Sequence, residues 1–381
     1  MTKIPKKLQQ KLETRNANNA LRQLGNQCNL VNFSSNDYLG FAASKIIFEK
    51  THNYLTEYNL TRNGATGSRL LSGNHKLYAV VETMLCKFHN SEAALVFNSG
   101  YDANLGFFSC VPQHHDIIFY DELIHASIRD GITMSNASAY KFKHNDLDDL
   151  HHKLSIRSQS RKLESEIYIV TESVFSMDGD SPNLLTLSKI CKTHNAHFIV
   201  DEAHAIGVFG NNGAGLIQEL NLENDVFARI VTFGKGLGCH GAAILGSDTL
   251  KQYLVNFARP LIYTTGLPPH ALATIKIAYE EMVTSPENEK LHHNIQFFKS
   301  EVNKLQLFFI NSNSAIQCCI VPENDKVKSI AQKMQAHGFD VKAILSPTVP
   351  KGTERLRFCL HSYNSEKEIT EIMQLLATFV K

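Results

Sequence analysis

The stretches HFIVDEAH (197–204) and RIVTFGKG (229–236) decide the fold. Each joins a short, nearly all-apolar run to charged or glycine residues that follow directly. Such a run is typical of a strand that is buried on both faces of a parallel sheet. Asp201 ends the first run, and Lys235 follows the second between two glycines. Because ligands bind beyond the carboxyl ends of strands in an open α/β sheet, both residues are candidates for a functional site.

The same pattern continues through the middle of the chain. Further apolar runs lie at 93–97, 116–120, 167–170 and 242–245. Helix-like stretches separate several of them, at 77–88, 123–134 and 184–194. Short buried strands that alternate with helices predict an α/β fold with a mostly parallel central sheet.

Beyond about residue 285 the pattern predicts a smaller α+β module. Helices are expected at 294–308, 326–337 and 366–380, and strands at 315–321 and 356–360. Near the start, residues 5–24 are expected to form a helix. We therefore predict an N-terminal helix and arm (1–40), a large domain (41–280) and a small C-terminal domain (281–381).

Composition excludes several classes of protein. Lys and Arg number 38 and Asp and Glu 37, a net charge of +1, which gives no electrostatic footprint for nucleic acid or an anionic membrane. No apolar run reaches the roughly 18 residues of a membrane span, and no secretory signal is recognisable. Eight cysteines without a CxxC pair predict reduced thiols. We expect a cytoplasmic enzyme.

Three motifs suggest other chemistry but lack the context it requires. DEAH (201–204) is a Mg²⁺-binding box in some nucleotide hydrolases, yet no GxxxxGK[ST] phosphate loop accompanies it. GLGCHG (236–241) matches a dinucleotide fingerprint, yet a strand-like AAIL follows where a helix is required. Cys191, His194 and His197 have metal-like spacing, but a helix-to-strand turn does not keep them on one face. We predict no metal site.

One set of residues fits a single chemistry. NSGYDAN (98–104) places Gly100 between a predicted strand and a helix start, where backbone N–H groups can hold a phosphate. Lys235 supplies an amine that can form a Schiff base, and Asp201 supplies a carboxylate for a pyridinium nitrogen. These are the parts that pyridoxal 5′-phosphate (PLP) requires. From the residues alone, a purely structural role for the set stays open.

Six ordered motifs then indicate a family. They are NFSSNDYLG (32–40), GATGSRLLSG (64–73), DELIHASIRDG (121–131), TESVFSMDGD (171–180), DEAHAIGVFG (201–210) and VTFGKGLG (231–238). Together they resemble the α-oxoamine synthase family of fold-type I PLP enzymes, over almost the whole chain. The resemblance implies an acyltransferase that joins an amino acid to an acyl thioester. It also implies a homodimer with shared active sites.

The resemblance assigns roles to individual residues. Lys235 is expected to carry the cofactor and move the α-proton, Asp201 to pair with the pyridinium nitrogen, and His125 to stack on the ring. Further cofactor-binding residues are expected at Gly100, Tyr101, Ser176, His204, Thr232 and Thr264. Thr264 is expected to reach the phosphate held by the partner subunit. A turn residue and a core histidine stay the alternatives for Ser176 and His204.

The substrates are implied by SPTVPKGTERLR (346–357) together with Arg22. Arg357 is expected to bind the amino-acid carboxylate, and Arg22 and Thr348 to meet the acyl chain. The resemblance of these features to one branch of the family implies L-alanine and pimeloyl-CoA or pimeloyl-carrier protein as substrates, with CO2 and free thiol as products. A solvated helix face stays the alternative for Arg22. A sister synthase with another substrate pair, a DEAH-type nucleotide hydrolase and a non-catalytic binding module stay the alternatives for the function.

Overall fold

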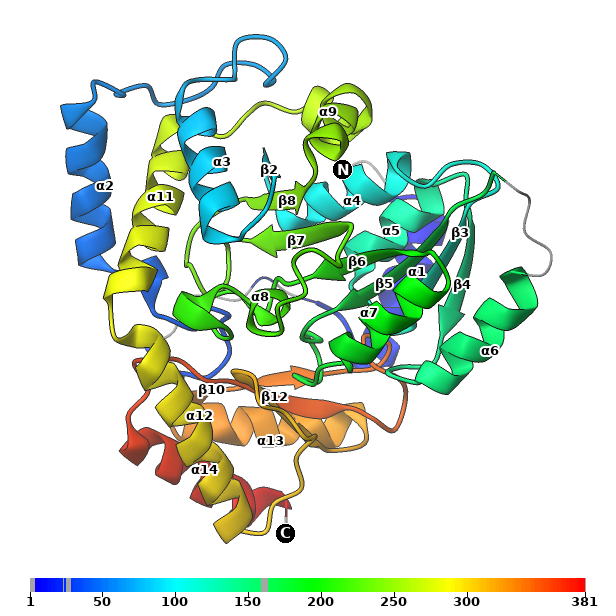
Figure 1. Ribbon diagram of the computed structural model, residues 1–381. Coiled ribbons are helices and arrows are strands. Elements are labelled where there is room, and N and C mark those ends of the chain that lie inside the picture. The colour runs from blue at the N-terminus through cyan, green and yellow to red at the C-terminus, as the bar shows by residue number, and fades with distance from the viewer. Residues whose placement is uncertain (1–3, 23, 25–28, 159–163, 381) are drawn as a thin grey trace. The chain divides into compact units, whose positions relative to one another are not determined.

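The computed structural model describes residues 4–22, 24, 29–158 and 164–380. The chain forms two compact units (Figure 1). The large unit contains residues 36–176 and 180–292. The small unit contains the described residues among 1–35, 177–179 and 293–381. The described residues before Asn36 belong with the C-terminal segment, because β1 (Val31–Asn32) pairs in parallel with β10 (Phe339–Asp340).

A seven-stranded sheet forms the centre of the large unit, in the order β2-β8-β7-β6-β5-β3-β4 (Figure 1). The strands are β2 (Ala93–Phe97), β3 (Ile117–Asp121), β4 (Ser138–Phe142), β5 (Ile167–Glu172), β6 (His197–Asp201), β7 (Ala228–Thr232) and β8 (Ala242–Gly246). Only β8 among them runs antiparallel to its neighbours, β2 and β7. The mostly parallel α/β sheet expected from the sequence is confirmed.

Helices surround this sheet in two packed groups, in which α4 contacts α5, α9 and α10, whereas α11 contacts α2 and α3. The α-helices of the large unit are α2 (Lys45–Glu57), α3 (Leu77–Phe88), α4 (Gly100–Cys110), α5 (Ala126–Met134), α6 (Leu147–Ser158), α7 (Leu184–Thr193), α8 (Leu216–Glu219), α9 (Asp248–Phe257), α10 (Arg259–Ile262) and α11 (Pro269–Thr284). Two short 3₁₀ helices are η1 (Phe41–Ala43) and η2 (Asn211–Gly213).

Side chains on both faces of the strands are buried. Ala228 and Ile230 of β7 pack in one core cluster with Phe107 of α4. The intervening Val231 is also fully buried, although it points to the opposite face. Burial on both faces explains why these strands are apolar without alternation.

The small unit contains a three-stranded antiparallel sheet in the order β11-β12-β9. Its strands are β9 (Ile316–Ile320), β11 (Lys342–Ile344) and β12 (Arg355–Cys359). Its helices are α1 (Lys6–Ala17), α13 (Asn324–Ala336) and α14 (Glu366–Val380). The boundary between the units falls within α12 (Glu287–Lys304).

Two elements differ from the sequence-based expectation. The first helix ends at Ala17 rather than near residue 24, because Asn19 takes a positive φ of 49° and its amide donates to Asp325. Asparagine tolerates that conformation and favours turns over helix interiors. Strand β4 was not predicted, because its sequence SAYKF is mostly exposed and lacks an apolar run. It lies at the sheet edge, where polar residues discourage pairing with other chains.

The described residues give limited findings on cysteines and membranes. Free thiols are found at Cys86, Cys110, Cys191, Cys239, Cys318, Cys319 and Cys359. Cys28 lies outside the described residues. No helix in the described ranges combines the length and the apolar character of a membrane span.

A buried ion pair accounts for the acidic Glu202 of the DEAH stretch. The Arg229 guanidinium donates to Glu202 Oε2 over 2.9 and 2.6 Å, and both side chains are almost fully buried. Arg229 also donates to the carbonyls of His89 and Ala214, and Ile217 N–H donates to Glu202 Oε1. The pair joins β7 to the segment after β6, so Glu202 has a structural role here.

Replacing Arg229 with Met should strongly destabilise the large unit. The variant leaves the Glu202 carboxylate buried without its cation, which costs about 3–5 kcal/mol of unfolding free energy. Urea unfolding at neutral pH measures the loss. As a control, Lys45→Ala removes an exposed pair with Glu49 and should cost about 0.5 kcal/mol or less. Equal losses in the two variants would contradict the assignment.

Candidate active site

Neighbouring parallel strands of the large unit end in polar residues at one edge of the sheet. Glu172 ends β5, Asp201 ends β6 and Thr232 ends β7. Glu172 and Asp201 are in register on adjacent strands. A cavity of about 250 Å³ lies at this edge. Six predicted residues line it: Gly100, Tyr101, His125, Asp201, Thr232 and Lys235.

Asp201 is held by a hydrogen bond at each carboxylate oxygen. Its Oδ2 accepts from the Asn104 side chain over 2.8 Å, and its Oδ1 accepts from Ala203 N–H over 2.9 Å. The residue is only 4% exposed. Asn104 belongs to α4, so this helix orients the Asp201 carboxylate at the end of β6. A buried, oriented carboxylate is a partner for a protonated ring nitrogen.

Lys235 lies at the start of a chain of polar side chains that ends at Asn36, which also lines the cavity. Its Nζ is 2.8 Å from Nε2 of His204, and His204 Nδ1 is 2.6 Å from the Tyr38 hydroxyl. The Tyr38 hydroxyl donates in turn to Asn36 Oδ1 over 3.3 Å. If the His204 ring is neutral with its proton on Nδ1, every hydrogen bond in this chain points the same way. Lys235 Nζ then donates to His204 Nε2, His204 Nδ1 donates to the Tyr38 hydroxyl, and that hydroxyl donates to Asn36. His204 therefore orients the amine.

His125 lines the cavity and also caps a helix. It is the N-cap of α5, and its Nδ1 is 2.7 Å from the Ser127 hydroxyl. Its backbone N–H donates to Glu172 Oε1 over 2.5 Å. Burial lowers the pKa of His125, against the attraction of Asp201 and together with repulsion from Lys235. The ring is therefore neutral at neutral pH.

Glu172 is a second buried carboxyl group beside Asp201. Burial, followed by the charge of Asp201, raises the pKa of Glu172 to about 8. Glu172 therefore keeps a proton at neutral pH while it supports the His125 backbone. Sequence reasoning gave no role to Glu172, Asn104 or Ser127. The signal for Glu172 was available, because it ends an apolar strand as Asp201 does.

The amino end of α4 provides a place for an anion. The helix starts at Gly100, and the Oγ of its N-cap Ser99 accepts from Asp102 N–H over 3.0 Å. The first N–H groups of a helix have no acceptor within the helix. A Cβ on Gly100 would lie 2.6 Å from Thr232 Cγ2, so a larger residue does not fit there. Thr232 Oγ1 is buried and has no hydrogen-bond partner among the described residues.

Several predicted residues lie elsewhere. Ser176, half-buried, and Thr264 are outside the lining of this cavity, and Thr264 accepts from the Asn98 amide over 3.2 Å. In the small unit, Arg22 Nη2 is 3.5 Å from Thr348 Oγ1, and both residues line a cavity of about 180 Å³. Arg357 is buried on β12, with Nη1 2.9 Å from Cys359 Sγ.

No cluster of His, Cys, Asp and Glu suited to a metal ion occurs in the ranges that the structure describes. Cys191 is buried, and His197 instead pairs with Glu166 over 3.2 Å.

Comparison with known proteins identifies the family. The model of the aminotransferase class I and II family matches residues 29–376, and the chain belongs to this family. A protein of Emericella nidulans named 8-amino-7-oxononanoate synthase is 39% identical over 374 residues, covering 92% of this chain and 89% of that protein.

Solved structures share the fold. The crystal structure of 8-amino-7-oxononanoate synthase from Francisella tularensis has a TM-score of 0.78 and 29% identity, covering 92% of this chain and 98% of that chain. A structure of SPT with a PLP internal aldimine has a TM-score of 0.85 and 27% identity, covering 92% and 87%. The chain is thus a PLP-dependent enzyme of fold type I.

The residues at the cavity fit PLP. The unpartnered Thr232 hydroxyl and the glycine at the start of α4 leave a cradle for its phosphate. The oriented Asp201 carboxylate suits its ring nitrogen, and Lys235 lines the same cavity. The phosphate, the ring nitrogen and the aldehyde of the cofactor therefore each have a matching side chain or backbone group in the large unit.

Glu172→Gln should change the pH dependence of stability in protein freed of cofactor. Because the folded-state pKa of Glu172 is raised to about 8, its folded form binds more protons than its unfolded form between pH 4.5 and 8. Wild-type stability therefore falls as the pH rises through this window, and the glutamine variant lacks that loss. The difference in melting temperature, variant minus wild type, should therefore increase by a few degrees between pH 5 and pH 9. A flat difference in differential scanning fluorimetry would exclude the raised pKa.

Proposed function

We propose that the chain catalyses the decarboxylative condensation of L-alanine with pimeloyl-CoA or pimeloyl-carrier protein. The products are 8-amino-7-oxononanoate, CO2 and the free thiol, and the reaction belongs to biotin biosynthesis. The observation that carries the proposal is the convergence of Lys235, Asp201 and His125 on one cavity. The 39% identity to a named 8-amino-7-oxononanoate synthase supports this substrate pair. The structural likeness to SPT favours a sister synthase as the second candidate.

The large unit supplies the groups that hold the cofactor. When bound, PLP withdraws electrons from the amino-acid Cα and so stabilises the carbanion that the condensation needs. The Asp201 carboxylate would keep the ring nitrogen protonated. The N–H groups of Gly100 and Tyr101, with the Thr232 hydroxyl, would bind the phosphate. Ser176 is proposed as a further hydroxyl contact.

Lys235 and His125 have different roles toward the cofactor. Lys235 would carry the cofactor between turnovers and then take the α-proton from the amino acid. His204, 2.8 Å from the amine, would orient it and contact the ring hydroxyl. His125 would stack on the cofactor ring. Its neutral state keeps a second positive charge away from Lys235.

Substrate recognition is assigned to arginines of the small unit. Arg357 would bind the alanine carboxylate through its planar, two-pronged guanidinium. Arg22 and Thr348, which line one cavity, would meet the pimeloyl chain or its terminal carboxylate. The proposed assembly is a homodimer in which Thr264 reaches the phosphate bound by the partner subunit.

The first test measures thiol release by the PLP-loaded protein. Pimeloyl-CoA with L-alanine should give the highest kcat/KM, ahead of acetyl-CoA with glycine and palmitoyl-CoA with L-serine. Arg22→Ala should lower kcat/KM for pimeloyl-CoA by roughly tenfold to 150-fold, because one charge-assisted contact contributes about 1.5–3 kcal/mol. Lys11→Ala, on the exposed surface of α1, is the matched control. Preference for serine and palmitoyl-CoA would instead establish the sister synthase.

Lys235→Ala should abolish both turnover and covalent retention of the cofactor. Loss of the amine removes the group that moves the proton, so kcat should fall by roughly 100- to 10,000-fold or more. Borohydride treatment followed by mass spectrometry should add the reduced cofactor to wild type and not to this variant. Lys251→Ala, which removes a lysine paired with Glu82 outside the cavity, should behave as wild type. A Lys235→Ala protein that keeps both properties would refute the assignment.

A further inference from the structure

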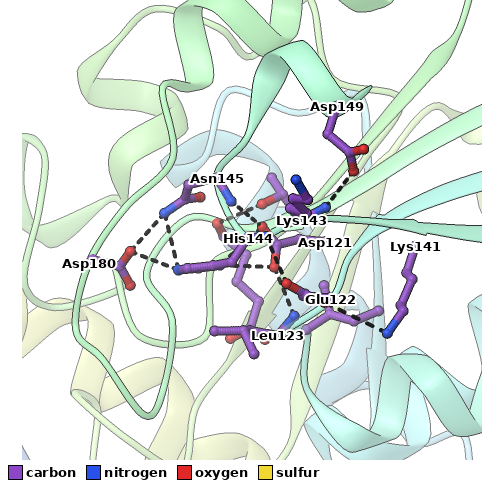
Figure 2. A network of polar contacts seen from close by, with 12 residues as sticks. Asp121, Glu122, Leu123, Lys141, Lys143, His144, Asn145, Asp149 and Asp180 are labelled. Atoms are coloured by element: carbon purple, nitrogen blue, oxygen red, sulfur yellow. Dashed lines mark hydrogen bonds and ion pairs between the residues drawn. The ribbon is translucent and has the colours of Figure 1, made fainter. Parts of the chain in front are cut away.

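A half-buried histidine outside the cavity lies between two carboxylates (Figure 2). His144 Nδ1 is 2.9 Å from Asp121 Oδ1, and its Nε2 is 2.9 Å from Asp180 Oδ2. Its side chain is 22% exposed and that of Asp121 is 1% exposed. The imidazole and the Phe175 ring pack in a T-shaped arrangement, with an interplanar angle of 89° and centroids 4.5 Å apart. None of the motifs or roles considered so far accounts for this arrangement.

The geometry defines the protonation state of the ring. A carboxylate oxygen only accepts hydrogen bonds, so both ring nitrogens must carry hydrogens to bond two carboxylates. His144 is therefore an imidazolium. Burial alone would lower its pKa, but the hydrogen bonds and charges of Asp121 and Asp180 raise the pKa to about 9.

Asp121 connects this histidine to the turn before His125. The carboxylate ends β3, and it accepts from Leu123 N–H over 2.8 Å and from Asn145 N–H over 2.8 Å (Figure 2). The Asp121 carbonyl also accepts from Ile124 N–H. The turn fixed by these bonds leads directly to His125, the N-cap of α5 that lines the cavity.

Asp180 connects the histidine to the segment after β5. Besides His144, its Oδ2 accepts from the Asn145 side chain over 2.7 Å (Figure 2). Its carbonyl accepts from Phe175 N–H over 3.0 Å, which closes the loop that follows Glu172. Glu172 in turn accepts from the His125 backbone. The two carboxylates thus belong to the two segments that meet at His125.

We propose that His144 is a positioning residue, which as an imidazolium shared by Asp121 and Asp180 holds the 121–125 turn against Phe175 and Asp180 and so fixes the His125 ring in the PLP cavity. Without the cation, the buried Asp121 carboxylate and the partly buried Asp180 carboxylate face each other, and the turn separates from Asp180. The inference rests on the proposed role of His125 at the cofactor.

The test compares His144→Phe with His144→Arg in the holoenzyme. Phenylalanine keeps an aromatic ring against Phe175 but removes both N–H donors and the charge, whereas arginine keeps a charge and paired donors. His89→Phe is the control, because it replaces a buried histidine whose ring bonds Tyr279 and lies outside the cavity. The readouts are visible circular dichroism of bound PLP, PLP affinity by fluorescence titration, melting temperature and steady-state kinetics.

The expected result separates positioning from stability alone. Well below its melting temperature, His144→Phe should show a weakened dichroic band, and kcat should fall roughly tenfold to a hundredfold. KM for the amino acid should change by less than about threefold, because the groups that bind it are untouched. His144→Arg should recover part of the band, and His89→Phe should only melt earlier. A His144→Phe enzyme with a lower melting temperature but wild-type dichroism and PLP affinity overturns the proposal.

A double-mutant cycle tests whether His144 acts through His125. In a His125→Asn background, His144→Phe should have little further effect on the dichroic band, whereas additive effects would overturn the route through His125. If His144→Phe does not fold, Asp180→Asn weakens the same clamp with less disruption. It should shift the band in the same direction, and an unchanged band overturns the proposal.

These spectral readouts need no acyl substrate. A dichroic response in an enzyme that does not use alanine and pimeloyl-CoA would therefore support the positioning role and reject the proposed function.

Discussion

The alignment of strand ends in the large sheet is the constraint on which the site depends. Because β5, β6 and β7 are parallel neighbours, their last residues fall at one edge, where the apolar strands stop and polar side chains become possible. Glu172, Asp201 and Thr232 occupy those three positions. The antiparallel β8 does not disturb the edge, because β2 runs in the same direction as β7 and delivers the start of α4 beside Thr232. The sheet thus assembles cofactor-binding groups from segments far apart in sequence.

Buried charged side chains in the large unit have hydrogen-bonding partners that fix their orientation. Glu202 meets Arg229, and Asp201 is held by Asn104 and Ala203. An isolated buried charge would be expensive, so each pair also restricts how neighbouring segments can be arranged. The adjacent residues Asp201 and Glu202 illustrate two outcomes. One carboxylate faces the cavity, and the other stabilises the fold behind it.

Sequence reasoning was most effective where periodicity and position agreed. The apolar runs gave the central sheet, and the residues that follow them gave Asp201 and Lys235. Edge strand β4 was missed because its exposed residues carry no apolar pattern. Asn104 and His144 were missed for another reason. Their roles depend on contacts with residues 97 and 36 positions away, Asp201 and Asp180, and such contacts leave no local pattern.

The position of protons at the cavity has a further consequence. Glu172 is protonated at neutral pH, because its pKa is raised, and the His125 imidazole is neutral, because its pKa is lowered. Both groups respond to the charge of Asp201 and Lys235, so any charged molecule that enters the cavity changes their proton affinities. By thermodynamic linkage, protons then pass between the site and the solvent during binding. The affinity of the cavity for an ionic ligand therefore depends on the pH of the solution.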